Sequence, residues 1–205
     1  ATEGGGTVIT AKEWMERPGS VGLAWPGSEI RIYDEDGVQQ PAGTIGTVYM
    51  QLMADFEYKG DAAKTKANRI ENFFTVGDLG EMDEDGYLYL RDRKADMIIS
   101  GGVNIYPAEI EGELINHPAV QDVAVFGIPN ADWGEEIKAV VELHEGFEPG
   151  DELATEITAW AGTRMGKFKL PKSIDFVDEL PREPNGKLIK RKLRDPYWEG
   201  VDRQI

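Results

Sequence analysis

A series of short segments between residues 22 and 90, in which apolar and polar residues alternate, constrains the fold more than any other feature. Ile30 and Ile32 are separated by a polar residue, and Val48 and Met50 show the same spacing further along the chain. A period of two places apolar side chains on one face of a β-strand. The first part of the chain is therefore predicted to be β-rich, with one apolar face on each strand.

The tetrapeptide Asp-Glu-Asp-Gly occurs twice, at residues 34–37 and 83–86, and each copy stands between two alternating segments. Aspartate accepts hydrogen bonds from nearby backbone amides, and glycine adopts the positive φ of a tight turn. Calcium binding is the other interpretation, but an EF-hand loop needs spaced oxygen ligands and a glutamate at its twelfth position. We therefore predict a hairpin turn at each copy.

The periodicity changes after about residue 92, where helical spacing appears. Pro107 is predicted to open a helix that ends at 116–118, and Asp151 is predicted to cap a second helix that Gly166 stops. Runs of apolar residues predict three strands, at 120–128, 137–143 and 174–177. The predicted fold class is therefore α+β, and the second half has the order β, α, β, β, α, β after a boundary near residues 91–95.

Composition excludes several classes of function. Acidic residues outnumber basic ones by 38 to 22, and the net charge of −16 opposes non-specific binding to nucleic acid or anionic lipid. The chain has no cysteine and only two histidines, His117 and His144, so a thiol nucleophile and a multi-histidine metal site are excluded. No apolar run approaches the roughly 20 residues of a transmembrane helix. We expect a cytoplasmic protein with no nucleic-acid partner and no transmembrane segment.

Two glycine-containing segments are the candidates for chemistry. Gly101 and Gly102 follow a predicted strand and precede a predicted helix, and paired glycines let a slender ligand or another backbone approach closely. Taken alone, the glycine pair is better explained by a tight strand-to-helix turn. The Pro/Gly-rich loop 181–187 ends in Lys187, but Leu188 follows where a Walker A loop needs Ser or Thr. The basic residues at 164–172 and 187–194 fit either solvated faces or phosphate recognition.

Three motifs together identify a resemblance. They are Thr-Glu-Gly-Gly at 2–5, Val-Gly-Asp at 76–78 with Asp-Arg at 92–93, and Gly-Lys at 186–187. Their order and spacing resemble those of the adenylate-forming enzymes, and the whole chain resembles the C-terminal part of an acyl-CoA synthetase. The most specific stretch runs from Arg93 through Ile-Ser-Gly-Gly-Val-Asn-Ile-Tyr-Pro-Ala-Glu-Ile-Glu. The resemblance implies that 1–92 form the last, incomplete, barrel-like β-rich subdomain of a large domain, and that 93–205 form a mobile C-terminal domain.

The resemblance also implies a role for each motif residue. Thr2 would bind the α-phosphate of ATP and Glu3 would hold Mg²⁺, while Asp78 with Arg93 would bind the ribose hydroxyls. Lys187 would be the catalytic lysine. It would stabilise the charge that develops when the acid carboxylate attacks the α-phosphorus to give acyl-AMP and pyrophosphate.

A second step would follow adenylation. The C-terminal domain would rotate, and Gly101 and Gly102 would border the path by which the thiol of CoA reaches acyl-AMP. Ala95 occupies the hinge position, where relatives commonly have a charged residue. Either Ala95 rotates without a charged side chain, or Lys94 and Asp96 share that work.

The expected function is that of the C-terminal part of an ATP-dependent carboxylic acid:CoA ligase, with a fatty acid as the implied substrate. The sequence lacks the glycine-, serine- and threonine-rich phosphate loop of the family, so we expect these 205 residues to be inactive without the N-terminal part of the enzyme. One alternative is an acyl-AMP ligase that passes its acyl group to a carrier protein. The other is a non-catalytic binding module that retains the fold.

Overall fold

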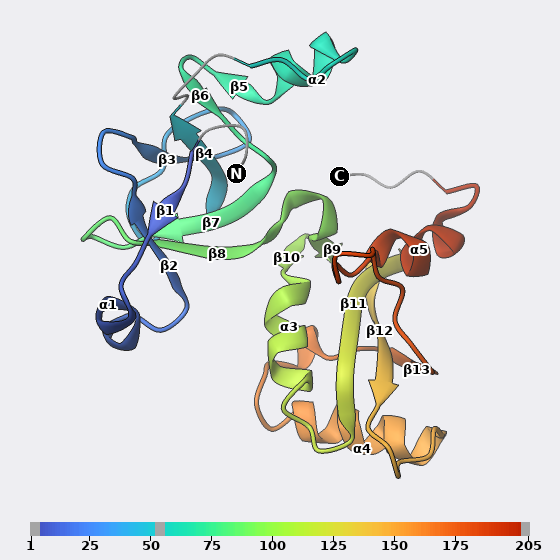
Figure 1. Cartoon of the computed structure of the whole chain (residues 1–205). Coiled ribbons are helices and arrows are strands. Elements are labelled where there is room, and N and C mark those ends of the chain that lie inside the picture. The colour runs from blue at the N-terminus through green and yellow to red at the C-terminus, as the bar shows by residue number, and fades with distance from the viewer. Residues whose placement is uncertain (1–4, 52–55, 202–205) are drawn as a thin grey trace. The chain divides into compact units, whose positions relative to one another are not determined.

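The computed structural model describes residues 5–51 and 56–201. The chain divides into two compact units, Ala1–Ala95 and Asp96–Ile205, which are called unit 1 and unit 2 below. Figure 1 shows a curled antiparallel sheet in unit 1 and a sheet covered by helices in unit 2. The α+β class, with a barrel-like β-rich part before an α+β part, is confirmed.

Unit 1 is built on one sheet. Its strands are β1 (Thr7–Val8), β2 (Ser20–Ala24), β3 (Ile30–Tyr33), β4 (Gly46–Gln51), β5 (Arg69–Ile70), β6 (Phe73–Phe74), β7 (Asp78–Met82) and β8 (Leu88–Arg93). The strand order is β1-β2-β8-β7-β4-β6-β5, and β3 pairs with β4. All of these pairs are antiparallel.

Both Asp-Glu-Asp-Gly segments are hairpin turns, as predicted. In the second copy, the Asp83 carboxylate accepts hydrogen bonds from the backbone amides of Asp85 and Tyr87 at 3.0 and 2.9 Å. Gly86 has a φ of +85°. Asp34 accepts two backbone amides in the same way in the first copy. The turn at 83–86 joins β7 to β8, and their register shifts by one residue at a bulge between Leu79 and Gly80.

The prediction of a single apolar face on each strand is wrong for β3 and β4. Residues with the predicted spacing do form a core with Phe74 and Leu88. Tyr33 and Tyr49 on the other face are also buried, with Phe73, and the two tyrosine rings pack edge to face at 5.1 Å. Tyrosine has an apolar ring that packs well although its hydroxyl is polar, so the alternation in the sequence understates burial.

Two short helices of unit 1, α1 (Ala11–Glu16) and α2 (Ala62–Ala67), were not predicted. In α1, Thr10 and Glu13 form a capping box, with each side chain bonded to the backbone amide of the other. Asp61 caps α2 by accepting a hydrogen bond from Lys64 N. Both helices have six residues, too few for a clear helical period in the sequence.

Unit 2 contains a second sheet, and other elements cover both of its faces. Its strands are β9 (Ile98–Ser100), β10 (Val103–Ile105), β11 (Val120–Asn130), β12 (Gly134–Leu143) and β13 (Ser173–Val177). The order is β10-β9-β12-β11, and β13 pairs with β12 in parallel. The remaining elements are α3 (Pro107–Leu114), α4 (Asp151–Ala161), α5 (Lys190–Arg194) and the 3₁₀ helices η1 (Lys94–Asp96), η2 (Lys167–Lys169) and η3 (Asp195–Trp198), of which η1 spans the boundary.

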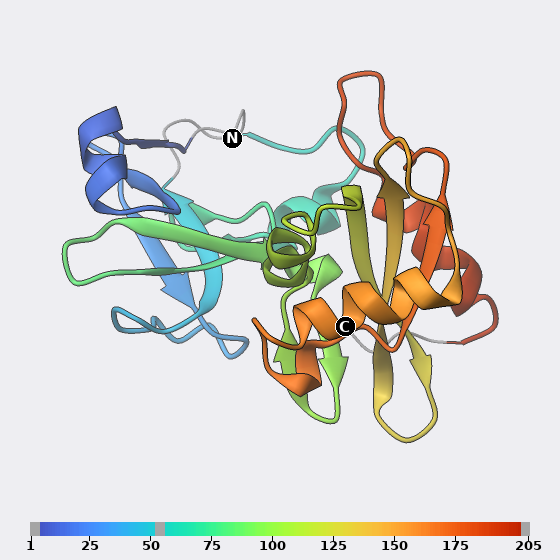
Figure 2. The ribbon, with the colours of Figure 1, turned by 90° about the horizontal axis from the view of Figure 1, so that it is seen from below.

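Helices α3 and α4 cover one face of this sheet. Ile110 and Leu114 from α3 and Ile157 from α4 are fully buried against apolar residues of β11 and β12. Figure 2 shows α4 lying across these two strands. On the opposite face, a smaller cluster joins Leu180 and Leu188 to Phe126. The sheet of unit 2 is therefore buried on both faces.

Of the two predicted helix starts, at Pro107 and Asp151, one is confirmed and one is wrong. Pro107 is the first residue of α3, as predicted, where its missing N–H costs nothing. Asp151 does not cap α4. Gly150 occupies the cap position. Asp151 lies in the first turn, where its negative charge interacts favourably with the positive end of the helix dipole. This helix ends at Ala161, before Gly166.

The glycine pair is not a strand-to-helix turn. Gly101 and Gly102 have φ values of +59° and +78° and connect β9 to β10, with Ser100 opposite Val103. Two consecutive residues with positive φ are the requirement of a type I′ hairpin turn, which explains why both are glycine. The sequence pattern missed β10 because this strand has only three residues before the helix signal begins.

None of the helices within residues 5–51 and 56–201 combines the length and apolar character needed to cross a membrane.

Candidate functional site

Asp78 and Arg93, the expected ribose-binding residues, lie opposite each other in unit 1. Asp78 begins β7 and Arg93 ends β8, and the two are register partners. Arg93 Nε lies 3.6 Å from Asp78 Oδ1, and the side chains are 53% and 27% exposed. The pair is accessible to solvent, and it offers carboxylate acceptors beside guanidinium donors. A diol can donate to such a carboxylate and accept from such a guanidinium.

The backbone around Asp78 is fixed by its neighbours. Gly77, with a φ of +86°, donates from its amide to the hydroxyl of Thr75 at 3.0 Å. The carbonyl of Gly77 accepts a hydrogen bond from Lys94 N at 2.8 Å. The bond from Lys94 to Gly77 therefore extends the β7–β8 pairing by one residue beyond the Asp78–Arg93 pair.

The expected hinge has an ion pair on each side. Lys94 Nζ lies 3.3 Å from Glu35 Oε1, and both residues belong to unit 1. Arg194 Nη1 lies 3.4 Å from Asp96 Oδ1, and both belong to unit 2. Ala95 is the last residue of unit 1 and stands between the two pairs. Lys94 is thus ion-paired within unit 1, and Asp96 is ion-paired within unit 2.

Lys187 lies in an exposed loop of unit 2. Arg182 and Leu188 form an antiparallel bridge that closes the loop, and Gly186 has a φ of +87°. Asn185 Oδ1 accepts a hydrogen bond from Lys187 N at 3.0 Å. In the part of the chain that the structure describes, the Lys187 ammonium has no ion-pair or hydrogen-bond partner. A lysine in this state is available to an anionic ligand.

Gly101 lies against the exposed ring of Trp133. The amide of Gly101 donates to the Trp133 carbonyl at 2.8 Å. A Cβ atom added to Gly101 would lie 2.5 Å from Trp133 Cε3, whereas one added to Gly102 would have no neighbour within 4 Å. The tip of the β9–β10 hairpin is therefore closely packed at Gly101 and open at Gly102.

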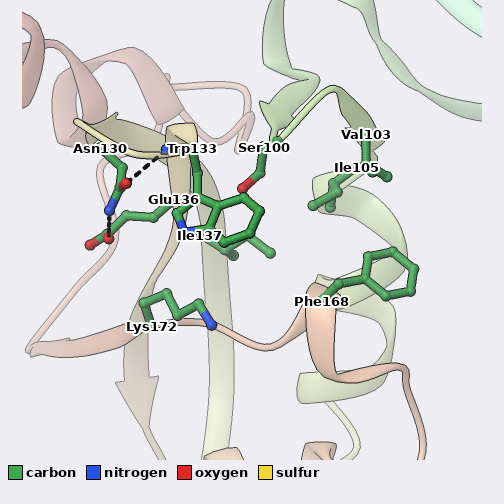
Figure 3. A pocket seen from close by; sticks show the side chains of 10 residues that line it. Ser100, Val103, Ile105, Asn130, Trp133, Glu136, Ile137, Phe168 and Lys172 are labelled. Atoms are coloured by element: carbon green, nitrogen blue, oxygen red, sulfur yellow. Dashed lines mark hydrogen bonds between the residues drawn. The ribbon is translucent and has the colours of Figure 1, made fainter.

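A pocket of about 270 Å³ opens beside this hairpin. Its lining residues are Ser100, Gly101, Val103, Ile105, Asn130, Trp133, Glu136, Ile137, Phe168 and Lys172. Figure 3 shows the Trp133 ring and the Lys172 side chain facing the opening, with Phe168 across from them. Asn130 accepts the amide of Trp133 at 3.0 Å and donates to Glu136 Oε2, so it fixes this corner of the pocket.

Sequence reasoning did not identify Trp133 or Phe168, and it treated Lys172 only as one member of a basic cluster. Trp133 is 61% exposed and Phe168 is 56% exposed. Two exposed aromatic rings at one pocket form an apolar patch, and such a patch is a feature of ligand-binding grooves. A sequence signal did exist, since Trp133 stands in a polar turn between two strongly apolar strands.

Several of the basic side chains have structural partners. Lys190 lies 2.8 Å from Glu111, Lys169 pairs with Glu109, and Arg164 stacks on the Trp160 ring at 3.6 Å. Lys172 and Lys187 differ from these three, because neither ammonium has a partner within residues 5–51 and 56–201. Both lysines are therefore candidates for binding an anion.

Two of the expected residues, Thr2 and Glu3, lie outside the described residues. Within residues 5–51 and 56–201, no group of three or more His, Cys, Asp and Glu side chains could hold a metal ion. The structure brings Asp78 next to Arg93, and Lys187 does not line the pocket beside the glycine pair.

Comparison with known proteins identifies the class. Residues 109–187 match the family of AMP-binding enzyme C-terminal domains. The structure superposes on ATP-bound MatB from Rhodopseudomonas palustris with a TM-score of 0.80 and 39% sequence identity, over 90% of this chain and 37% of that one. The fold is that of an adenylate-forming enzyme. The chain belongs to the AMP-binding, adenylate-forming superfamily, and it is similar to the C-terminal portion of the acyl-CoA ligases.

Two of the relatives are named as fatty acid ligases. The chain is 38% identical to the long-chain-fatty-acid–CoA ligase FadD13 of Mycobacterium tuberculosis over 98% of its length. It is 35% identical to the fatty acid–[acyl-carrier-protein] ligase ScoC of Streptomyces coeruleorubidus over its full length. The chain spans about two fifths of the length of each relative, 39% and 40%.

Proposed function

We propose that this chain is the C-terminal part of an ATP-dependent acid:CoA ligase that works through an acyl-AMP intermediate. In the first step, a carboxylate oxygen attacks the α-phosphorus of ATP and the bond to pyrophosphate breaks. In the second, the sulfur of a thiol attacks the acyl carbonyl, the bond to AMP breaks and the thiol loses its proton. The similarity to FadD13 supports a fatty acid as the substrate.

In this proposal the two segments divide the work. Residues 1–92, together with Arg93 directly after them, complete the nucleotide site of the large domain, with Asp78 and Arg93 on the ribose and Thr2 on the α-phosphate. Mg²⁺, held with the help of Glu3, neutralises the phosphate charge when it is bound with ATP. Residues 93–205 form the mobile domain, which brings Lys187 to the α-phosphate. Its ammonium stabilises the charge that builds up there during the attack.

The observation that carries the choice of CoA is the pocket beside Gly101. Its volume of about 270 Å³ is just below the range of roughly 300 to 1,000 Å³ for pockets that enclose a drug-sized ligand. It would therefore receive one end of a longer molecule. Trp133 and Phe168 offer aromatic faces for an adenine ring, and Lys172 offers a cation for a phosphate. CoA has these groups at the end opposite to its thiol.

A carrier protein is the second candidate acceptor, because ScoC is named as a ligase for one. The phosphopantetheine arm of a carrier protein has a thiol and one phosphate but no adenine. It would leave the faces of Trp133 and Phe168 uncovered. The two acceptors therefore differ in whether the pocket contributes to acyl transfer.

The acceptor is tested in the full-length enzyme with three thiols: CoA, pantetheine and a carrier protein bearing phosphopantetheine. If CoA is the acceptor, Trp133→Ala raises the KM for CoA and leaves the reaction with pantetheine unchanged. Trp14→Ala, which removes another half-exposed tryptophan from unit 1, is the matched control. Preference for the carrier protein, with no effect of Trp133→Ala, would overturn the proposal for CoA in favour of the carrier.

Adenylation is tested through Lys187. Lys187→Ala removes transition-state charge stabilisation of roughly 3 to 4 kcal/mol, which is a loss of about a hundredfold to a thousandfold in the rate of acyl-AMP formation. Thioester formation from supplied acyl-AMP changes much less, because the ammonium has no role in that step. Lys192→Ala, at an exposed position of α5, is the control. Full adenylation activity in the Lys187 variant would contradict the proposed role.

A further inference from the structure

The loop that carries Lys187 is tied to the sheet of unit 2 by one guanidinium. Arg182 Nη1 donates a hydrogen bond to the carbonyl of Gly186 at 2.5 Å. Arg182 Nη2 forms an ion pair with the carboxylate of Asp122, which lies on β11. One side chain therefore joins the residue immediately before Lys187 to a strand of the core.

The other hydrogen bonds of the loop have a different effect. Glu183 N donates to the Lys187 carbonyl at 2.8 Å, and Gly186 N donates to the Glu183 carbonyl at 2.8 Å. Lys187 N donates to Asn185 Oδ1. These bonds join members of the loop to one another, so they maintain its shape without fixing it to the sheet. In the described part of the chain, Arg182 provides the polar link between loop and sheet.

Apolar contacts hold the two ends of the loop but not its tip. Leu180 is buried before the loop, and Leu188 packs partly against the same cluster after it. Residues 183–187 between them are exposed. Gly186 adds a permissive backbone position directly before Lys187, with a φ of +87°. Without a tie to the sheet, the tip has little that restrains its position.

We infer that Arg182 is a positioning residue for Lys187, and that it acts through the Gly186 carbonyl with Asp122 as its anchor. This inference rests on the proposed role of Lys187 in adenylation. The ammonium must meet the α-phosphate in a defined geometry, and a misplacement of about 1 Å can cost on the order of a hundredfold in rate. Holding the backbone next to Lys187 limits such misplacement before ATP is engaged.

The geometry requires arginine rather than lysine. A guanidinium presents several N–H groups in a rigid plane, so it can donate to a carbonyl and a carboxylate at once. A lysine ammonium is a single point of charge on a flexible stem. Arg182→Lys is therefore expected to keep the charge while losing one of the two contacts.

The test measures the two half-reactions separately in the full-length enzyme. Arg182→Ala is expected to lower the kcat of acyl-AMP formation about tenfold to a hundredfold without changing the KM for ATP or for the acid. Thioester formation from supplied acyl-AMP is expected to stay at the wild-type rate. Arg182→Lys is expected to fall between wild type and Arg182→Ala. Arg191→Ala removes an exposed arginine of α5 and is the matched control.

A double variant separates positioning from a general structural role. If Arg182 acts through Lys187, the variant lacking both side chains adenylates no more slowly than Lys187→Ala alone. If Arg182 only stabilises unit 2, the two losses multiply. Asp122→Asn, which weakens the anchor while keeping an oxygen acceptor, is expected to give a smaller loss with the same selectivity. It also serves as the test if Arg182→Ala does not fold.

Two results would overturn the inference. One is an equal loss in both half-reactions for Arg182→Ala or Asp122→Asn. The other is a multiplicative loss in the double variant. If instead Lys187→Ala itself spares adenylation, the proposed function of Lys187 fails and the positioning role falls with it. That outcome is distinguished from the other two by the single Lys187 variant.

Discussion

Asp78 and Arg93 face each other across the end of the β7–β8 hairpin, with Arg93 Nε 3.6 Å from Asp78 Oδ1. The Asp83 turn sets the register from Met82 to Gly80, and a one-residue bulge between Leu79 and Gly80 then places Asp78 opposite Arg93. At this separation the guanidinium is close enough to orient the carboxylate, while both side chains keep surface exposed to a ligand. Two residues that are separated in the sequence thus place a carboxylate acceptor beside guanidinium donors.

The first prediction concerns this pair. Under the proposed function, Asp78→Asn loses charge-assisted hydrogen bonds to the ribose, and such bonds contribute about 1.5 to 3 kcal/mol each. The KM for ATP is expected to rise about tenfold to a hundredfold. Arg93→Ala is expected to have a smaller effect, because this side chain is more exposed. Steady-state kinetics of the full-length enzyme measure both, and Asp36→Asn in the first Asp-Glu-Asp-Gly turn is the control. An unchanged KM in Asp78→Asn would exclude the ribose role.

The second prediction compares the two glycines of the β9–β10 hairpin. Alanine at either position costs about 1 to 2 kcal/mol, because a residue with a Cβ is strained at positive φ. Only Gly101→Ala also displaces the Trp133 ring, which lies 2.5 Å from the position of the new Cβ. Urea unfolding is expected to show similar losses of stability for the two variants. The Trp133 indole signal in an NMR spectrum is expected to shift markedly in Gly101→Ala alone.

The open position allows a separate test of the thiol path. Gly102 has no neighbour within 4 Å of an added Cβ, so a larger side chain there meets solvent or ligand. In the full-length enzyme, Gly102→Trp is expected to slow thioester formation more than adenylation. Equal losses in the two half-reactions would indicate that Gly102 serves only the geometry of the turn.

The third prediction concerns Ala95. Proline fixes φ near −65°, so Ala95→Pro prevents a rotation that depends on this residue. One half-reaction is expected to be lost and the other largely retained, because the two would use different backbone conformations at the hinge. Ala95→Ser keeps the backbone free and is expected to retain both. If proline and serine variants behave alike, rotation does not occur at Ala95, and Lys94 and Asp96 become the candidates.

The fourth prediction concerns pH. Burial lowers the pKa of His117 below the ordinary histidine value, opposed by the charge of Glu156 and assisted by that of Arg164. The neutral ring is used in the fold, where Nδ1 accepts the amide of Ala119 at 3.1 Å. Below about pH 6.5 the unfolded chain binds a proton that the folded chain takes up only at lower pH. Stability contributed by His117 is thus present above this pH and lost as the pH falls.

Urea unfolding between about pH 8 and pH 5 measures this loss. His117→Asn keeps an oxygen acceptor for the Ala119 amide but cannot titrate, so the decline in stability at acid pH is expected to be shallower. His144→Asn changes the other histidine, which is not buried, and is expected to retain the wild-type profile. A profile for His117→Asn identical to that of the wild type would show that His117 makes no contribution.

Local signals in the sequence predicted the parts of the fold that depend on neighbouring residues. Pro107 marked the start of α3 correctly, and the aspartates of both Asp-Glu-Asp-Gly turns form the hydrogen bonds that their position indicated. The prediction failed where distant partners decide the outcome. Tyr33 and Tyr49 are buried because they pack on each other and on Phe73, which no alternation pattern encodes.

The same distinction applies to the candidate site. The resemblance to a known family identified Asp78 and Arg93, and their pairing agrees with a shared task. The pocket was not predictable in this way, because Trp133 lies in the turn between β11 and β12 and Phe168 lies in η2, and the packing of unit 2 brings them together. The Arg182 contact was hidden for the same reason, since Asp122 is 60 residues away in the chain.

The parallel pairing of β13 with β12 has a consequence for how unit 2 is assembled. The antiparallel strands β11 and β12 are joined by a short turn and can pair early, whereas β13 reaches β12 only after α4 and both its flanking loops are in place. Until then, the edge of β12 from Lys138 to Glu142 has unpaired backbone groups that can pair with another chain. Refolding at high protein concentration is therefore the condition in which this domain is most exposed to aggregation. The Lys187 loop follows β13 in the chain, so the segment proposed to perform the chemistry is among the last to reach its native position.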